Sequence, residues 1–266
     1  MPNPIEYSKL TNELSYVIYN VGARLTYILR YPWLRRHLVC NTRFKDKHKG
    51  ERCFIVGNGP SLLKQDLSYL ENETVFCVNY MYKSDLIDVL KPTYYCVVDS
   101  SVLKSDDFLP DLLSKTDCDA YFFSWRFLSY LTNPQVDNID KQRMHFAYAK
   151  HMPSRWSVRT NMHTFASAFI NVICSTIMTA LYMGFAEIYL LGCDFNQFIY
   201  DKHAYNPQGT VLAYPIANTL RGHAIAAEQH EYLFKLSKKL ETDIFNATPE
   251  SSLNVYPFVE YQKIFK

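Results

Sequence analysis

Four polar side chains stand at or shortly after the ends of short apolar runs of the sequence, a position that suits ligand binding. They are Asn58, Asn79, Asp99 and Asp194. An asparagine amide both donates and accepts hydrogen bonds, so it can bind a ribose hydroxyl, a base edge or a phosphate. The same residues could instead satisfy the backbone of a turn or cap a helix. For the two aspartates, orienting a sugar, holding a metal and capping the next helix all stay open.

His223 is the residue best suited to acid–base chemistry. It follows a stretch rich in tyrosine, asparagine, proline and glycine, and it precedes a predicted helix. Histidine is the natural general base near neutral pH. A lone histidine is more often structural, but its place after a possible lid, together with the resemblance given below, favours catalysis here. The histidines without a comparable setting are His145, His151, His163, His203 and His230.

The segment Gly57-Asn58-Gly59-Pro60-Ser61 could bring a ligand close to the backbone. Glycine permits a sharp turn and a close approach, and Pro60 suits the first position of a helix. The N-terminus of that helix could face an anion such as a nucleotide phosphate. The loop lacks the third glycine of the dinucleotide fingerprint and the Lys-Ser/Thr of a P-loop. A strand, turn and helix without a ligand is the alternative interpretation.

The elements around these residues alternate between strand and helix, which predicts a mostly parallel sheet. The predicted strands are Cys53–Val56, Val75–Val78, Tyr94–Val98, Ala120–Phe123, Glu187–Leu191 and Thr242–Phe245. Helices are expected over residues 164–183 and 223–240, and irregular segments over 126–162 and 196–222, the second as a possible lid. Ligands of such sheets bind beyond the carboxyl ends of the strands, where the four polar residues fall.

The N-terminal segment differs from the rest of the chain. Apolar residues recur at three- and four-residue steps, so we expect an amphipathic helix over residues 5–31 that ends at Tyr31-Pro32. Residues 1–52 hold ten Lys/Arg and four Asp/Glu, a net charge of +6, whereas the whole chain carries +2. This helix could contact a membrane through residues 5–37, or it could pack on the body or on a second subunit. We therefore divide the chain into residues 1–52 and a catalytic domain over 53–266.

The cysteines and the apolar runs of the sequence indicate the cellular compartment of the protein. The seven cysteines are an odd number without a C-x-x-C pair, which argues for a reducing compartment and against disulfides or a zinc site. The sequence shows no signal peptide and no apolar run long enough to span a membrane. We expect a cytoplasmic protein, with peripheral attachment to the inner face of the membrane as one option.

These motifs together resemble a known family of bacterial enzymes. Residues 55–61, the strand before Asn79, residues 184–195 and Gly222-His223 are similar to the bacterial α-2,3/2,8-sialyltransferases of Campylobacter type. They are also similar to the related MptE-like family, which includes archaeal 6-hydroxymethylpterin pyrophosphokinase and flagellin-modifying nonulosonate transferases. The resemblance covers roughly residues 53–260.

The resemblance implies a Rossmann-like variant of the GT-A fold and a metal-independent enzyme that uses a CMP-linked sugar acid. His223 would be the general base, and no metal or other cofactor would be needed. The donor-binding residues that it implies, together with the candidates above, are Gly57, Asn58, Gly59, Pro60, Ser61, Asn79, Asp99, Asn171, Asp194, Tyr200, Tyr205 and Ser251. In this set a lid tyrosine, Tyr200 or Tyr205, would contact the phosphate, and Ser251 would lie near the cytidine.

Three departures from the family pattern affect the donor more than the fold. Asn171-Val172-Ile173 replaces Thr-Ser-Gly, Asn196 replaces a tyrosine, and Asp99 replaces an asparagine. Sialic acid, another nonulosonate, Kdo or an unrelated nucleotide sugar all stay open as the transferred group.

We therefore interpret the chain as an inverting glycosyltransferase of surface-glycan assembly, such as lipopolysaccharide or capsule biosynthesis. Its expected partners are a nucleotide-sugar donor, a glycan or glycolipid acceptor and, as further options, a membrane surface or a homo-oligomer; nucleic acid is not expected. One alternative is a pyrophosphokinase that uses ATP and magnesium, with Asp99 and Asp194 as ligands. Another is a non-enzymatic oligomeric binding module.

Overall fold

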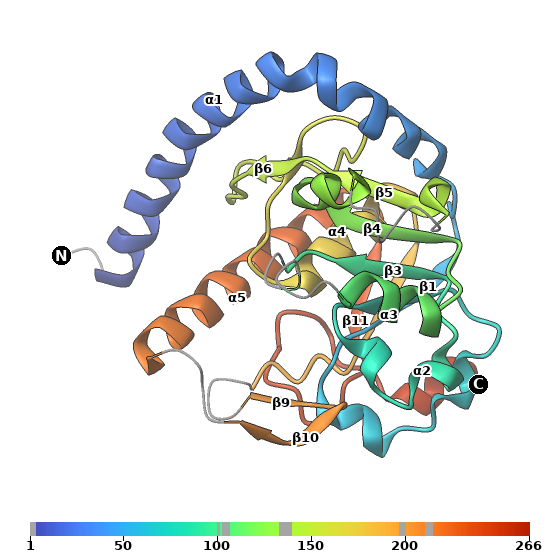
Figure 1. Cartoon of the computed structure of the whole chain (residues 1–266). Coiled ribbons are helices and arrows are strands. Elements are labelled where there is room, and N and C mark those ends of the chain that lie inside the picture. The colour runs from blue at the N-terminus through green and yellow to red at the C-terminus, as the bar shows by residue number, and fades with distance from the viewer. Residues whose placement is uncertain (1–3, 100–101, 103–106, 133–139, 197–200, 211–214) are drawn as a thin grey trace.

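A seven-stranded parallel sheet forms the centre of the molecule (Figure 1). The computed structural model describes residues 4–99, 102, 107–132, 140–196, 201–210 and 215–266. The strand order is β11-β8-β1-β2-β3-β4-β5, and every neighbouring pair is parallel. The strands are β1 Arg52–Val56, β2 Val75–Val78, β3 Tyr94–Val97, β4 Ala120–Ser124, β5 Met144–Ala147, β8 Glu187–Leu191 and β11 Asp243–Asn246. This confirms the predicted Rossmann-like α/β fold.

Helices and two small sheets surround this centre. The helices are α1 Pro4–Leu38, α2 Ile87–Leu90, α3 Phe108–Lys115, α4 Val172–Met183 and α5 Ile216–Lys239. The remaining strands are β6 Ala149–His151, which pairs with β7 Ala166–Ser167, and β9 Asp201–His203, which pairs with β10 Asn206–Thr210. Short 3₁₀ helices are η1 Val39–Phe44, η2 Pro60–Lys64, η3 Leu67–Leu70, η4 Met81–Lys83, η6 Trp125–Thr132, η8 Lys141–Arg143 and η9 Tyr261–Phe265.

The core is divided by the sheet into two hydrophobic clusters. Successive strand residues point to opposite faces, so Phe54 and Val56 pack with α1 and α3 on one face. Cys53 and Ile55 pack with α4 on the other face, together with Leu233 of α5. Because both faces are covered, the central strands β2 and β3 are apolar and buried along their whole length, as a buried parallel sheet requires.

The cysteines belong mainly to these clusters. All seven are free thiols, six of them are buried, and Cys40 is exposed. The six buried thiols pack as small hydrophobic residues within the two clusters.

Four boundaries predicted from the sequence are wrong. β5 and β6 lie in the segment 126–162 that was expected to be irregular. The helix expected over 164–183 begins only at Val172, because Asn171 caps it and accepts a hydrogen bond from the Ile173 N–H at 2.7 Å. The helix expected from residue 223 begins at Ile216, so the end of the predicted lid is helical, and its middle forms the β9–β10 hairpin.

The fourth error concerns Pro32, which does not end α1. The helix continues to Leu38 with Pro32 inside it. Proline removes one backbone hydrogen bond and disfavours a helix, but Leu34 and Leu38, both fully buried, hold the last turns against the body. Tertiary packing thus outweighs the local preference. The expected boundary at residues 52–53 stays a prediction.

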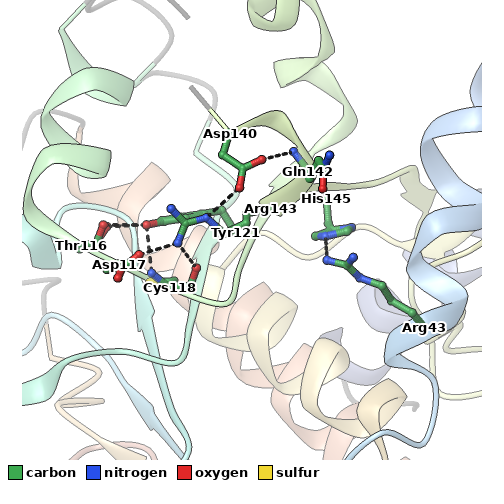
Figure 2. A network of polar contacts seen from close by, with 9 residues as sticks. All are labelled: Arg43, Thr116, Asp117, Cys118, Tyr121, Asp140, Gln142, Arg143 and His145. Atoms are coloured by element: carbon green, nitrogen blue, oxygen red, sulfur yellow. Dashed lines mark hydrogen bonds and ion pairs between the residues drawn. The ribbon is translucent and has the colours of Figure 1, made fainter. Parts of the chain in front are cut away.

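The edge strand β5 is fastened to the 3₁₀ helix η1 through His145 (Figure 2). Arg43 Nη2 lies 2.7 Å from His145 Nε2, and His145 Nδ1 lies 3.2 Å from Asn41 Oδ1. Because arginine can only donate, Nε2 accepts and Nδ1 carries the proton that is donated to Asn41. Burial, followed by the charge of Arg43, lowers the pKa of His145 to about 4. The imidazole is therefore neutral in the folded protein at neutral pH.

A second contact in Figure 2 ties the start of β5 to the loop before β4. Arg143 forms an ion pair with Asp117 and donates to the Cys118 carbonyl at 3.0 Å. Tyr121 donates to the Thr116 carbonyl at 2.9 Å and accepts from the Cys118 N–H at 3.2 Å. The short strand β5 is thus held at its N-terminal end by side chains, beyond its ladder with β4.

We predict that the free energy of unfolding decreases as the pH falls from about 6.5 toward 4. The unfolded chain binds a proton on His145 near its ordinary pKa of about 6.5, whereas the folded chain does so only near 4. His145→Gln should reduce this pH slope and cost about 1–2 kcal/mol at pH 7, because Arg43 and Asn41 lose their shared partner. Urea unfolding at several pH values measures both effects; an unchanged slope in the variant would contradict this account of His145.

Candidate functional site

A cavity of about 440 Å³ lies at the carboxyl end of the central sheet. Its walls come from the ends of β1, β2 and β8, the start of α4, the β9–β10 hairpin and one face of α5. This is the place where ligands of open parallel sheets bind. Its lining residues are Gly57, Asn58, Asn79, Ile170, Asn171, Val172, Ile173, Gly192, Cys193, Asp194, Phe195, His203, Asn218, Thr219, Gly222, His223, Ala226, His230 and Leu253.

Two glycines, Gly57 and Gly59, let the loop after β1 touch the loop after β8. Gly57 N donates to the Leu191 carbonyl at 2.7 Å, and Gly59 N donates to the Gly192 carbonyl at 2.8 Å. A Cβ atom on Gly57 would lie 2.5 Å from the Gly192 oxygen, and one on Gly59 would collide with the Asp194 carboxylate. Gly57 and Gly59 are therefore required by loop-to-loop contact, and Gly57 also forms part of the cavity wall.

Asp194 joins the same two loops with its side chain. Its carboxylate accepts from Ser61 Oγ at 2.7 Å and from the Ser61 N–H at 3.3 Å. The side chain is buried, which raises its pKa, while the two hydrogen bonds from Ser61 oppose the rise. Asp194 borders the cavity, but its carboxylate oxygens are occupied by the hydrogen bonds from Ser61 in the loop after β1.

Asn58 and Asn79 present buried amide oxygens at the cavity. Neither Oδ1 atom has a hydrogen-bond partner among the described residues. Asn79 has a φ of +44°, which asparagine tolerates better than most residues. Tyr95 fixes its backbone by donating to the Asn79 carbonyl at 3.0 Å. Because buried acceptors are rarely left unsatisfied, these two oxygens mark the surface where a ligand would bind.

His223 reaches the cavity from α5. It is half-buried, and burial lowers its pKa below 6.5. The ring of Phe195 packs against it edge-on, with centroids 5.1 Å apart. The imidazole is thus neutral at physiological pH and able to accept a proton.

Phe195 has a strained backbone in this wall. Its φ is +55°, a conformation that bulky residues rarely adopt. The conformation places its ring against both His223 and His230, the second at 5.7 Å. Strain of this kind is kept where the surrounding structure over-determines it, often at functional sites.

The cavity is also lined by two histidines that were not selected from the sequence, His203 and His230. His230 is fully buried, its Nδ1 lies 2.9 Å from the Tyr256 hydroxyl, and its Nε2 has no partner among the described residues. Burial lowers its pKa to about 3. The seven-residue spacing between His223 and His230 puts both on one helix face, so helical periodicity could have found it.

The hairpin that carries His203 is joined to the glycine loop. Ala204 N donates to the Asn58 carbonyl at 2.7 Å. His203 stacks on Tyr205, with centroids 4.9 Å apart, and Tyr205 contacts Tyr80 edge-on. The predicted lid tyrosine Tyr205 is therefore beside the wall residue His203 without itself lining the cavity, and Tyr200 lies outside the described residues.

The structure brings six predicted site residues to the cavity: Gly57, Asn58, Asn79, Asn171, Asp194 and His223. Among the other described candidates, Gly59, Pro60, Ser61, Asp99, Tyr205 and Ser251 do not line it. Ser251 instead donates to the Cys193 carbonyl at 2.6 Å and accepts from Asn246 Nδ2 at 3.1 Å. It supports the loop after β8 from behind.

The structure does not support the predicted anion-binding site at a helix N-terminus after Gly59. Pro60 begins a 3₁₀ helix of five residues, not an α-helix. So short an element carries little dipole. The polar side chains of the cavity, and not this helix, are the groups available to a phosphate.

The sequence contains one D-x-D spacing among the described residues before β4, Asp117-Cys118-Asp119. It precedes β4, at the amino end of the sheet, where Asp117 pairs with Arg143. It is therefore remote from the cavity at the carboxyl ends. Within the described residues, no group of three or more His, Cys, Asp or Glu side chains could hold a metal ion.

A comparison with protein families identifies one match. Residues 35–198 match the model of the family described as 6-hydroxymethylpterin diphosphokinase MptE-like. The match includes Asn58, Asn79 and Asp194 and ends before α5, which carries His223. No curated protein is similar enough to count as a relative of this chain.

Similar folds are found among solved structures. The sialyltransferase CstII from Campylobacter jejuni, in complex with a substrate analogue, CMP-3FNeuAc, is 20% identical, with a TM-score of 0.49 over 78% of this chain and 86% of that chain. The sialyltransferase CST-II in complex with a trisaccharide acceptor and CMP is 19% identical, with the same TM-score and coverage.

We predict that Gly59→Ala destabilises the protein by about 1–3 kcal/mol or more, because the new methyl group would occupy the place of the Asp194 carboxylate. Gly22→Ala is the matched control: no atom lies within 4 Å of its added Cβ, and its helical position should gain up to about 1 kcal/mol. Urea unfolding compares the two. Equal stability of Gly59→Ala and the unmodified protein would refute the loop-contact argument.

Proposed function

This chain belongs to the 6-hydroxymethylpterin diphosphokinase MptE-like family, and within that family we propose that it acts as a glycosyltransferase. It would move a sugar acid from a CMP donor to a hydroxyl group of a glycan acceptor. The observation that carries the proposal is one cavity that combines the acceptor oxygens of Asn58 and Asn79 with the neutral imidazole of His223.

The cavity suits a ligand with many hydroxyl groups. Its volume of about 440 Å³ falls in the range of small-molecule sites. Its polar walls are asparagine amides, imidazoles and the threonine hydroxyl of Thr219, with the Asp194 carboxylate turned to Ser61. Ribose and sugar hydroxyls donate to amide oxygens, and amide or imidazole N–H groups can hold a single phosphate.

The reaction would need one base. Neutral His223 takes the proton of the acceptor hydroxyl while that oxygen forms a bond to the anomeric carbon of the donor sugar. The bond from this carbon to the phosphate oxygen breaks, and its electron pair leaves with CMP. The product is a glycoside of inverted configuration, with the proton on the imidazole. Burial keeps the free imidazole unprotonated at neutral pH, so that it is available to accept this proton.

CMP release tests the proposal directly. The chain is incubated with CMP-Neu5Ac and CMP-Kdo in EDTA, beside UDP-, GDP- and ADP-sugars. We expect slow release of CMP alone, and we expect His223→Ala to reduce transfer by about 10²-fold or more, the usual contribution of a general base. Gly22→Ala, on the distant helix α1, serves as the control. Turnover of the other nucleotide sugars in place of the CMP donors would refute the choice of donor.

The pH dependence of that activity gives a separate prediction. Because burial lowers the pKa of His223, the acid limb of kcat/KM should have its midpoint below pH 6.5. The residual activity of His223→Ala should lack this limb. A midpoint above 6.5 would mean that a carboxylate partner or another group controls the activity.

A second candidate is a pyrophosphokinase that transfers diphosphate from ATP, and the family description favours it. In that case turnover would require ATP with magnesium, and Asp194→Asn or Asp99→Asn would impair activity more than His223→Ala. The two functions therefore differ both in nucleotide and in the most sensitive residue.

A further inference from the structure

The long helix α1 has two opposite faces of different character. One face packs on the body: Ala23 and Leu34 are buried, and Tyr27 stacks on Phe165 with centroids 5.5 Å apart. Asn20 accepts from Met152 N at 2.7 Å and donates to its carbonyl at 2.9 Å. Figure 1 shows α1 curving around the outside of the molecule, so its opposite face is directed away from the body.

That outer face is apolar and exposed. Ile18 is 77% and Leu29 is 82% exposed, although neither residue gains from contact with water. We define the outer face by the residues Leu14, Val17, Ile18, Val21, Leu25, Ile28, Leu29 and Trp33, all exposed. An apolar row of this length marks an interaction surface on a soluble domain.

The width of the outer face distinguishes a flat partner from a helical one. Leu14, Ile18, Val21, Leu25 and Ile28 follow the four–three spacing of a coiled-coil seam. At 100° per residue, however, the apolar arc runs from Val17 to Trp33, roughly 160° around the helix. A two-helix seam is narrower than this, whereas an interfacial membrane helix buries such an arc in the plane of the lipid.

The positive charge of this segment also favours a membrane surface as the partner. Residues 14–45 contain six Lys/Arg and no Asp/Glu. The arginines Arg24, Arg35 and Arg36 are exposed on α1. Parallel pairing of two copies would bring like charges together, because the acidic residues of α1, Glu6 and Glu13, precede this segment. An anionic surface would attract its cations.

We propose that the outer face of α1 binds the surface of a membrane that contains anionic lipids. The helix lies in the plane of the headgroups, its aliphatic residues enter the acyl boundary, and its arginines contact lipid phosphates or carboxylates. Among the described helices, none is long and apolar enough to cross a bilayer. The binding is independent of the reaction proposed above, since it uses no residue of the cavity.

Vesicle sedimentation with the full chain tests this surface. Phosphatidylcholine vesicles with and without phosphatidylserine are the probes, at low and high salt. Ile18→Glu and Leu29→Glu place a charge on the outer face, where high exposure leaves folding unaffected. Val89→Glu is the matched control, because Val89 is 45% exposed on the body. Circular dichroism checks that each variant is folded.

We expect binding at least about tenfold tighter to the anionic vesicles, weaker binding at high salt, and loss of binding in both α1 variants but not in Val89→Glu. Equal affinity for both vesicles, or no binding to either, would overturn the proposal. Analytical ultracentrifugation tests the other partner, a second copy of this chain. If the protein forms a dimer that Ile18→Glu and Leu29→Glu dissociate, and it does not bind vesicles, the outer face is a dimer interface.

Discussion

The site depends on how closely two backbone loops approach at the end of the sheet. Gly57 and Gly59 after β1 hydrogen-bond to the end of β8, and no side chain fits between them. This contact brings the Asp194 carboxylate within reach of Ser61. Without it, the cavity floor would open, because Asn58 would lose the backbone that directs its amide, and the hairpin would lose the carbonyl to which Ala204 is bound.

Burial, more than nearby charge, sets the chemistry of the cavity. His223 and His230 both have lowered pKa values with burial as the first cause. The carboxylate of Asp194 is shifted in the opposite direction for the same reason. Lowering the dielectric around a group disfavours its charged form, whatever the sign. A cavity of this kind keeps its bases neutral and its hydrogen bonds strong, which suits proton transfer from a hydroxyl.

The sequence predicted the six strands with the strongest apolar patterns, and those strands place Asn58, Asn79 and Asp194 at one edge of the sheet. It failed where tertiary contacts decide. β5 reads as Met-His-Phe-Ala, and its position depends on partners from elsewhere in the chain: Arg43, which contacts His145, and the loop before β4, which contacts the preceding Arg143. α1 passes Pro32 because Leu34 and Leu38 are buried. Ser251 was predicted near the nucleotide, but its hydroxyl donates a hydrogen bond to the Cys193 carbonyl, a contact that no local sequence pattern reveals.

The distribution of the cysteines gives the protein one native position for selective labelling with a thiol reagent. Six thiols are enclosed in the core, where burial excludes reagents, and Cys40 alone is exposed, two residues after the end of α1. A maleimide fluorophore would therefore attach at a single position without any substitution. Placed beside the basic helix, that dye would respond to changes in polarity around α1, and it would do so while the cavity at the sheet edge keeps its native residues.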